Sequence, residues 1–381
     1  MTAHVFIVDD QTFPVHLQYR FAGTGARSHQ YIDFNDSPNT KFHHSTENLL
    51  AGMIADVSRI RKGDRILFYL QNSKGREGRF YGIFRAAEDA AFLDNGGDKQ
   101  FLLEELEKSL TFRILFEPEE VYPEGVTEWK ALDEIRFLEK PCQMLWSLIY
   151  RKLKGNRGCT MITSYEEDRL CGLIRAGQRP LNLSNNRMNF DCGTRKIILS
   201  ESGVKSYSGI KRPFLLMPRI LEKYRKGNQF EAHLQAHVVG QIGRPGSGLT
   251  NILLENNRPI WLGNEVGCGV GMQSIDVMIA YQNRCRHIMP IELKTTQAGS
   301  DNVRQIKRYV DWIEQYYISN CPAVIEPVLI TQKTGGGLSA DFVQAVRQFN
   351  SGAEEKTYSN LRLVEFYIKN DEIVWENRRI I

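Results

Sequence analysis

Features that mark several protein classes are missing from this chain of 381 residues. Its 7 cysteines are odd in number and form no Cys-x-x-Cys pair, so neither a disulfide framework nor a zinc ribbon is indicated. No run of about 18 apolar residues occurs, and the first residues show no basic segment followed by an apolar one. Internal repeats and low-complexity tails are also absent. We therefore expect a cytoplasmic protein that is neither secreted nor membrane-spanning.

What the chain does contain is the ordinary composition of a globular protein, with 42% hydrophobic and 25% charged residues. At roughly 150 residues per domain, this length predicts two domains. The formal net charge of +4 permits a polyanionic partner without requiring one. Short strands and helices alternate along the chain, which predicts an α/β protein that is α+β overall.

Residues 1–155 are predicted to form the first domain. A helix is expected over residues 47–61. Two strands are expected over residues 66–70 and 80–84, on either side of a Gly-rich, basic loop, because both runs are rich in β-branched and aromatic residues. A helix over residues 101–109 and the strand TFRILFEP follow, and a helical pattern begins near residue 131.

Residues 156–215 are predicted to be a connector of helix and loop, and residues 216–381 the second domain. Within the connector, Ser164 is the expected N-cap of a helix, and Glu167 would complete a capping box. The tract 182–208 is polar and rich in Gly, Ser and Asn, which indicates a loop.

Two acidic residues of the second domain lie in apolar surroundings typical of neighbouring strands. Asp276 stands within SIDVMIA, and Glu292 stands within MPIELK. Because alternate side chains of a strand share a face, Glu292 and Lys294 are expected to point one way while Ile291 and Leu293 face the core. Two carboxylates and a lysine would therefore meet at one end of a hairpin. The alternative is a solvated hairpin face, since a short D…ExK pattern arises often by chance.

Two helices are expected beside these strands. The segment NVRQIKRYVDWIEQYY has an apolar stripe at helical spacing, and Gln305 and Tyr309, four residues apart, would project together. Upstream, Glu231 lies on the helix FEAHLQAHVV and is positioned to add a third carboxylate. His233 and His237 on that helix are expected at its surface rather than on a zinc ion, because no third soft ligand accompanies them.

This set of groups suits metal-assisted hydrolysis of a phosphodiester. Oxygen ligands from Asp276 and Glu292, with the backbone carbonyl of Leu293, fit Mg²⁺, for which Mn²⁺ is an expected substitute. Lys294 would orient or help deprotonate the attacking water and offset the charge that develops on the phosphate.

The segments SIDVM, PIELK and QIKRYVDW, preceded by the helix that bears Glu231, resemble the PD-(D/E)xK nuclease superfamily, and within it the RecB-like and NucS-type group. The resemblance covers about residues 228–330, with a longer and more Gly-rich loop at residues 267–273 than such enzymes usually have. It implies a mixed sheet flanked by helices. It also implies roles for single residues: Asp276 and Glu292 as metal ligands, Lys294 as the catalytic lysine, Gln305 and Tyr309 as site-organising residues, and Glu231 as an accessory metal ligand.

The N-terminal order of helix, KGDRILFYLQN, basic loop and RFYGIFRA resembles the PUA-like superfamily, particularly EVE- and YTH-type domains. This resemblance implies a small β-barrel with helices and a pocket for a flipped or modified base, which needs aromatic faces and hydrogen-bonding groups. The protein core is the alternative place for any single aromatic residue. The candidates for nucleic-acid binding are Lys74, Arg76, Arg79 and Trp129, with Phe13, Tyr19, Phe21, Tyr31 and Phe34 as further aromatic residues.

These expectations combine into a Mg²⁺-dependent DNA endonuclease of restriction type. Its N-terminal domain would read a base, such as a modified one, in double-stranded DNA. A repair nuclease for mismatched or branched DNA is the alternative within the enzyme class. A non-catalytic nucleic-acid-binding protein is the alternative outside it. A homodimer is also expected, since cutting both strands takes two active sites.

Overall fold

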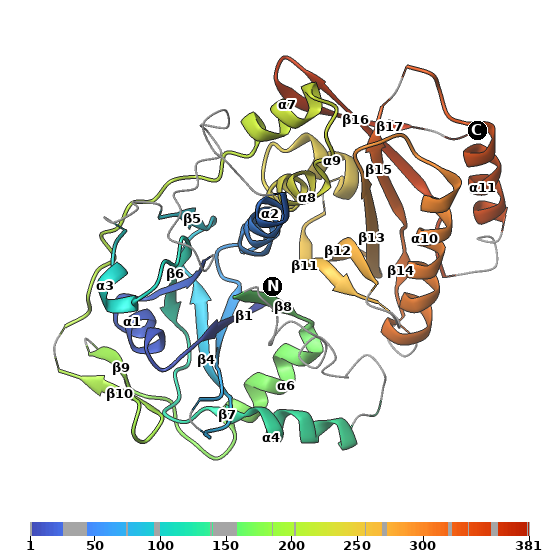
Figure 1. The fold of residues 1–381 in the computed structure, drawn as a ribbon. Helices are drawn as coiled ribbons and strands as arrows, with labels where there is room; N and C mark the ends of the chain where they lie inside the picture. Colours follow the sequence, from blue (N-terminus) through green and yellow to red (C-terminus); the bar gives the residue numbers. More distant parts are fainter. Residues whose placement is uncertain are drawn as a thin grey trace. The chain divides into compact units, whose positions relative to one another are not determined.

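The computed structural model describes residues 2–25, 44–73, 75–94, 100–137, 139, 158–184, 186–201, 203–255, 257–268, 273–318, 322–333, 335–351, 357–378 and 380. These residues fall into two compact units. Among them, the first unit holds residues 2–25, 56–139 and 158–214, and the second holds residues 44–55 and 215–380. The expected α/β class, α+β overall, is confirmed, since both units combine helices with sheets (Figure 1). None of the helices in the described segments has the length and apolar character needed to cross a bilayer.

The first unit is built on a curled, half-barrel sheet in the order β2-β6-β4-β3-β1-β8, with β5 on β6 and β7 on β4. β1 runs parallel to β3, whereas β3 and β4 form the antiparallel pair expected on either side of the basic loop. The strands are β1 (Ala3–Val8), β2 (Phe21–Thr24), β3 (Arg65–Leu70), β4 (Arg79–Ala86), β5 (Phe92–Leu93), β6 (Phe112–Pro118), β7 (Val126–Thr127) and β8 (Cys159–Ile162).

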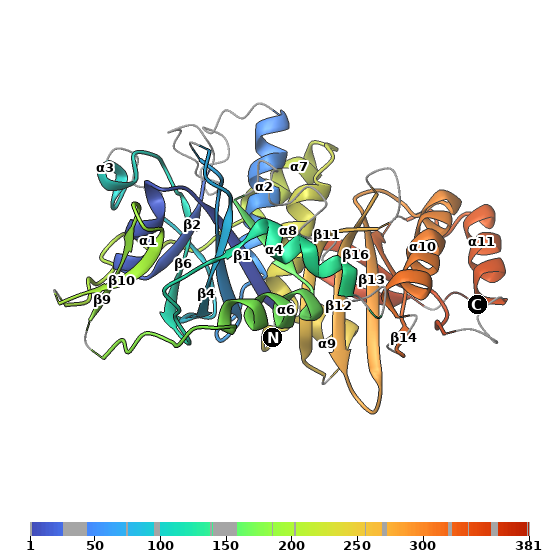
Figure 2. The same ribbon diagram turned by 90° about the horizontal axis from the view of Figure 1, so that it is seen from below.

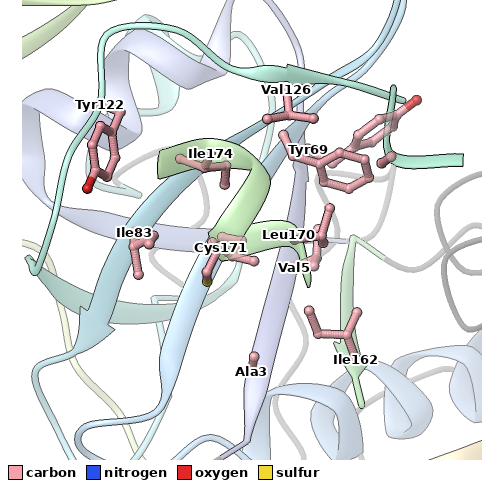
Figure 3. Packing of buried hydrophobic residues seen from close by; sticks show 13 residues of the cluster. Ala3, Val5, Tyr69, Ile83, Tyr122, Val126, Ile162, Leu170, Cys171 and Ile174 are labelled. Carbon is pink, nitrogen blue, oxygen red and sulfur yellow. The ribbon is translucent and has the colours of Figure 1, made fainter. Parts of the chain in front are cut away.

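One buried cluster joins this sheet to helix α6 (Ser164–Arg175). Figure 3 shows Leu170, Cys171 and Ile174 of the helix packed with Val5 of β1 and Ile83 of β4. Burial of such side chains stabilises the unit by about 1.5–3 kcal/mol for each large aliphatic residue. The remaining helices described in this unit are α1 (Thr12–Tyr19), α3 (Leu103–Leu106), α4 (Glu128–Asp133) and the 3₁₀ turn η2 (Glu134–Phe137).

The helix expected over residues 164–175 is present, but its N-cap differs from the predicted one. Thr163, not Ser164, is the N-cap, and its Oγ1 accepts from the backbone N–H of Glu166 at 3.3 Å. Glu166, not Glu167, completes the capping box, because its Oε2 accepts from the Thr163 backbone N–H at 2.7 Å. Glu167 instead pairs with Arg65 of β3 at 2.8 Å.

The segment expected as a connector, residues 156–215, contributes regular structure to the first unit. β8 pairs antiparallel with β1, and the tract expected to be a loop forms a hairpin of β9 (Arg187–Asp191) and β10 (Lys196–Ser200). Asp191 shapes the turn, since its side chain accepts from the Gly193 N–H at 2.9 Å. The expected helix over 101–109 shrinks to α3, and most of the helical pattern after residue 137 lies outside the described residues.

The second unit is built on a mixed sheet in the order β11-β12-β13-β15-β16-β17, with β14 on β13. β13, β15 and β16 run parallel, while β11, β12 and β13 form antiparallel neighbours. The strands are β11 (Pro259–Gly267), β12 (Ser274–Gln282), β13 (Arg286–Lys294), β14 (Val324–Ile325), β15 (Val328–Gln332), β16 (Arg362–Lys369) and β17 (Glu372–Arg378).

Helices pack along this sheet, and in both views α10 and α11 lie side by side (Figures 1 and 2). The predicted stripe of α10 and its π-helical extension is buried, as Ile306, Val310, Ile313 and Tyr317 are at most 1% exposed. The helices described in this unit are the start of α2 (His44–Ser58), α7 (Met217–Arg225), α8 (Glu231–Gln241), α9 (Gly248–Leu254), α10 (Ser300–Trp312), η4 (Ile313–Tyr317) and α11 (Ala340–Ser351).

Candidate functional site

Three carboxylates form a row across neighbouring strands of the second unit. One residue beyond the Val277–Ile291 pair of β12 and β13, Asp276 lies opposite Glu292. The register of β11 places Glu265 opposite Asp276 on the other side. Directly opposite residues of antiparallel strands are close neighbours on the sheet. This carboxylate row, Glu265, Asp276 and Glu292, is the centre of the candidate site.

Glu292 is fully buried and is held from two sides. The Nζ of Lys294, two residues along the same strand face, lies 2.8 Å from its Oε1. The hydroxyl of Tyr309 on α10 donates to its Oε2 at 2.8 Å, and Gln305 Nε2 donates to that hydroxyl at 2.6 Å. Three residues that the sequence singled out, Lys294, Tyr309 and Gln305, therefore gather around the carboxylate of a fourth, Glu292, and the catalytic role of this group stays a prediction.

The second carboxylate, Asp276, accepts a hydrogen bond from the backbone N–H of Leu293 at 2.8 Å. Burial and the charge of Glu292 raise the pKa of Asp276 well above its usual range. Burial also raises the pKa of Glu292, although the contacts with Lys294 and Tyr309 oppose the shift. Burial pulls the pKa of Lys294 down, but its pairing with Glu292 outweighs this and raises it, so the lysine stays charged at neutral pH.

The sequence analysis did not identify three residues of the site, Glu265 and its two hydrogen-bond donors Gln235 and Ser274. Gln235 on α8 is buried, and its Nε2 donates to Glu265 Oε1 at 3.0 Å and to the Asp276 backbone carbonyl at 2.9 Å. Ser274 Oγ donates to the other Glu265 oxygen at 2.9 Å. Glu265 itself has φ +50, an uncommon conformation for a non-glycine residue, which its two donors help to hold. The spacing of Glu231 and Gln235, four apart on α8, was the signal that could have identified the glutamine.

Glu231 lies at the first turn of α8 and is half exposed. Its Oε1 is 3.7 Å from Lys294 Nζ, so it contacts the lysine. Among the described residues, no group of three or more His, Cys, Asp or Glu side chains has the geometry to hold a metal ion. The expected role of Glu231 as an accessory metal ligand stays a prediction.

The chemistry of the donor set nevertheless fits a hard divalent cation. Asp276 and Glu292 offer carboxylate oxygens, the ligand type that Mg²⁺ prefers. Their raised pKa values show that two negative charges are costly at this place, and a bound cation would lower that cost. The residues that would hold Mg²⁺ are therefore Asp276 and Glu292, with the Leu293 carbonyl beside them.

The prediction that His233 lies at the surface of its helix is wrong. It is fully buried, and its Nε2 lies 2.9 Å from Glu47 Oε1 on α2. Arg219 and Lys223 of α7 contact the same carboxylate, at 2.6 and 3.3 Å. This Glu47 cluster fixes α8, the helix that carries Glu231 and the buried glutamine of the site.

The first unit has an open pocket of its own beside the basic loop. Trp129 on α4 is 61% exposed at this pocket. Ser73 and Arg76 exchange backbone hydrogen bonds of 3.1 and 2.8 Å, so the Arg76 backbone is fixed, and its side chain donates to the Cys192 carbonyl. Arg79 pairs with Glu77 at 3.4 Å, whereas Lys74 lies outside the described residues. The pocket is lined by Asn72, Ser73, Gly75, Arg76, Glu77, Glu128 and Trp129.

The other aromatic candidates that the structure describes do not line this pocket. Phe13 and Phe21 are fully buried in the core, which is the alternative that the sequence left open. Tyr19 packs edge-on against Phe101 at 5.5 Å. Tyr31 and Phe34 lie outside the described residues. Among the candidates in the described residues, Trp129 is the exposed aromatic side chain, whereas Tyr19 is partly buried.

No protein-family model and no curated protein matches the chain. Three solved structures are similar to part of it. A hypothetical protein from Leishmania major has 12% identity and a TM-score of 0.29, over 45% of this chain and 93% of that one. Human THYN1, solved in complex with DNA containing 5-methylcytosine, has 9% identity and a TM-score of 0.27, over 46% of this chain and 98% of that one. Rpa0253 from Rhodopseudomonas palustris has 14% identity and a TM-score of 0.26, over 46% of this chain and 93% of that one. TM-scores this low do not establish a shared fold.

Proposed function

We propose that the protein is a metal-dependent endodeoxyribonuclease whose active site is the carboxylate row of the second unit. The observation that carries the proposal is the group formed by Asp276, Glu292 and Lys294. Buried Glu292 and partly buried Asp276, on neighbouring strands, both have raised pKa values, and a charged lysine contacts Glu292. Perturbed acids next to a specific charge partner are typical of catalytic sites.

Each residue then has a role that its contacts support. Asp276 and Glu292 hold Mg²⁺, which when bound lowers the pKa of a coordinated water and offsets charge on the phosphate. Lys294 stabilises the charge that develops on the phosphate oxygens. Tyr309 keeps Glu292 in place through its 2.8 Å hydrogen bond, and Gln305 fixes the tyrosine hydroxyl.

The first unit supplies DNA recognition in this proposal. An exposed tryptophan offers a face on which a base can stack, and such stacking is worth about 1–3 kcal/mol per base. Arg76, which lines the pocket, and Arg79, the first residue of β4, provide charge for the phosphate backbone, and Lys74 is proposed to add to it. The base read at Trp129 would be an extruded one, such as a modified cytosine, because a paired base presents no open face.

The test is cleavage of two plasmid preparations by the full-length protein in the presence of Mg²⁺. One plasmid carries methylated or hydroxymethylated cytosine, and the other carries none. We expect wild-type protein to cut, Lys294→Ala to lose about 10²–10³-fold in rate, and Asp276→Ala to lose cleavage while keeping DNA affinity. Asp301→Asn, which changes an exposed carboxylate on α10, is the matched control and should cut normally.

The outcomes separate the parts of the proposal. Selective cutting of the modified plasmid supports both the nuclease and the base reader. Equal cutting of both plasmids keeps the nuclease and removes modification as the feature that is read. Cleavage confined to mismatched or branched duplexes would identify a repair nuclease instead. Asp276→Ala protein that cuts as well as wild type would exclude the carboxylate row as the active site.

A further inference from the structure

A second group of reactive side chains lies at the tip of the hairpin formed by β12 and β13. Cys285 is exposed, and its Sγ lies 3.3 Å from His287 Nε2. The other ring nitrogen, His287 Nδ1, lies 2.8 Å from Glu326 Oε1. The hydroxyl of Tyr281 donates to the two Glu326 oxygens at 2.8 and 2.9 Å. A thiol, an imidazole and a carboxylate thus follow one another at hydrogen-bonding distances.

Local structure holds the imidazole and the carboxylate in place. Tyr281 and His287 are directly opposite in the β12–β13 ladder, and their rings stack with centroids 4.5 Å apart and planes 7° apart. Glu326 directly follows β14, and its backbone N–H donates to the Ile288 carbonyl of β13 at 2.8 Å. At the turn, the Asn283 N–H donates to the Cys285 carbonyl at 3.0 Å, which brings the thiol back toward the histidine.

These contacts determine where the histidine carries its proton. An ionised carboxylate can only accept hydrogen bonds, so the neutral imidazole must donate from Nδ1 to Glu326. Nε2 then has a free lone pair that faces the Cys285 sulfur. Burial, together with the bond to Glu326, raises the pKa of Tyr281, so the phenol keeps its proton and donates to the carboxylate at neutral pH.

We propose that Cys285 is a reactive thiol that exchanges with low-molecular-weight disulfides, with His287 as its general base and Glu326 as the carboxylate that orients the histidine. A nucleophile, a base and an orienting group within hydrogen-bond reach are the arrangement by which proteins activate thiols. The site is independent of the proposed nuclease, because it lies at the other end of the two strands that carry Asp276 and Glu292.

The exchange reaction balances without any further reactant. The Cys285 proton passes to His287 Nε2 as the sulfur attacks one sulfur of the small disulfide. A new S–S bond forms while the old one breaks, and the departing thiolate recovers the proton from His287. The products are a mixed disulfide on Cys285 and one equivalent of the small thiol. Arg284, exposed beside the cysteine, favours an anionic disulfide.

The test is the rate at which the full-length protein reacts with dithiobis-nitrobenzoate, an anionic aromatic disulfide, followed by release of the coloured aromatic thiolate at pH 7. Cys192, the other exposed cysteine of the described residues, is the internal reference. We expect one thiol to react at least about 10-fold faster than Cys192, given the usual effect of a positioned base. Mass spectrometry should place the label on Cys285. Cys285→Ser should remove the fast phase, and Cys192→Ser should leave it.

Two further variants separate base catalysis from a structural role. His287→Ala should slow the reaction of Cys285 to the rate of Cys192, and added imidazole should restore it, which a purely structural histidine would not allow. Glu326→Gln keeps the size of the side chain and should slow the reaction in the same direction. A Cys285 that reacts no faster than Cys192 overturns the proposal. Equal rates in wild type and His287→Ala also overturn it. Asp276→Ala should leave the fast phase unchanged, so a failure of the nuclease proposal would not affect this result.

Discussion

At the scale of single residues, the candidate site concentrates negative charge where little water reaches it. Asp276 and Glu292 lie on neighbouring strands, each one residue beyond the Val277–Ile291 pair, and Lys294 is the nearby cation that contacts Glu292 directly. Buried charges destabilise a protein unless they are paired. Burial raises the pKa values of both acids, and the charge of Glu292 adds to the shift of Asp276 while Lys294 opposes it at both. The site is therefore expected to lower the stability of the metal-free protein.

The first prediction at this scale concerns the pH dependence of that effect. The pKa of Asp276 in the folded state lies above its unfolded value of about 3.9, so the folded state binds more protons than the unfolded state. The stability of the protein therefore falls as the pH rises from the unfolded pKa through the folded pKa. Asp276→Asn removes this charge and should raise the metal-free unfolding temperature at pH 8, by about 2–4 °C for each kcal/mol gained. Below pH 4 the variant and wild type should unfold at similar temperatures.

Magnesium provides the complementary measurement. Mg²⁺ should raise the unfolding temperature of wild type at pH 8 more than at pH 5, because protons compete with the cation for the carboxylates. Asp276→Asn should abolish this rise, and the control Asp301→Asn should retain it. Calorimetry of the three proteins with and without Mg²⁺ gives the comparison. An Asp276→Asn protein that is less stable than wild type at pH 8 would contradict the account.

The sequence predicted part of this site for a clear reason. Asp276 and Glu292 stand in short apolar runs that indicate strands, and Gln305 and Tyr309 have helical spacing, so local pattern was sufficient. Glu265 joins the row only through the register between β11 and β12. That register depends on pairing between strands, which local sequence does not specify.

At the scale of elements, the position of α8 depends on a buried ionic cluster. Glu47 is 2% exposed and accepts from Arg219 on α7, with Lys223 and His233 also in contact. Burial opposes ionisation, but the hydrogen bonds from His233 and Arg219 outweigh it and lower the pKa of Glu47 below its usual range. The sequence could not indicate this cluster, because α2 is separated from α8 by most of the first unit.

Glu47→Ala should therefore destabilise the second unit by about 3–5 kcal/mol, since it removes the carboxylate that pairs with buried Lys223, partly buried Arg219 and buried His233. Because the folded pKa is lowered, the stability from this carboxylate is present at neutral pH and lost as pH falls below about 4. Urea unfolding of wild type and variant at pH 7 measures the difference. Arg225→Ala, which breaks an exposed pair with Asp371, is the control and should cost less than about 1 kcal/mol. Equal losses in both variants would show that the cluster has no special role.

The N-cap of α6 and the β9–β10 hairpin differ from the prediction because local sequence patterns do not contain the contacts that determine them. The N-cap of α6 fell one residue earlier than predicted, because Ser164 and Thr163 are both good caps and only the backbone geometry separates them. The hairpin of β9 and β10 was missed because its polar composition is typical of loops. Its strands are stabilised by residues that are distant in sequence, such as Tyr81, which donates to the Arg195 carbonyl at 2.8 Å.

At the scale of the whole molecule, two compact units carry two separate sets of chemistry. The first offers Trp129 and Arg76 at an open pocket, and the second offers the carboxylate row and the Cys285 thiol at the tip of the β12–β13 hairpin. Sites with no shared residues generally contribute independently to measured free energies. Recognition and cleavage should therefore be separable by mutation.

Trp129→Ala should weaken binding to a duplex with modified cytosine by about 5–150-fold, the equivalent of about 1–3 kcal/mol of base stacking. At saturating protein, the same variant should still cleave in a Mg²⁺-dependent manner, because the carboxylate row is intact. Phe137→Ala changes an equally exposed aromatic residue of the first unit that does not line the pocket, and it should bind like wild type. Fluorescence anisotropy and plasmid cleavage on the same preparations measure both properties. Loss of cleavage at saturation in Trp129→Ala, with Phe137→Ala unaffected, would show that the tryptophan contributes to catalysis and that the two functions are not separable.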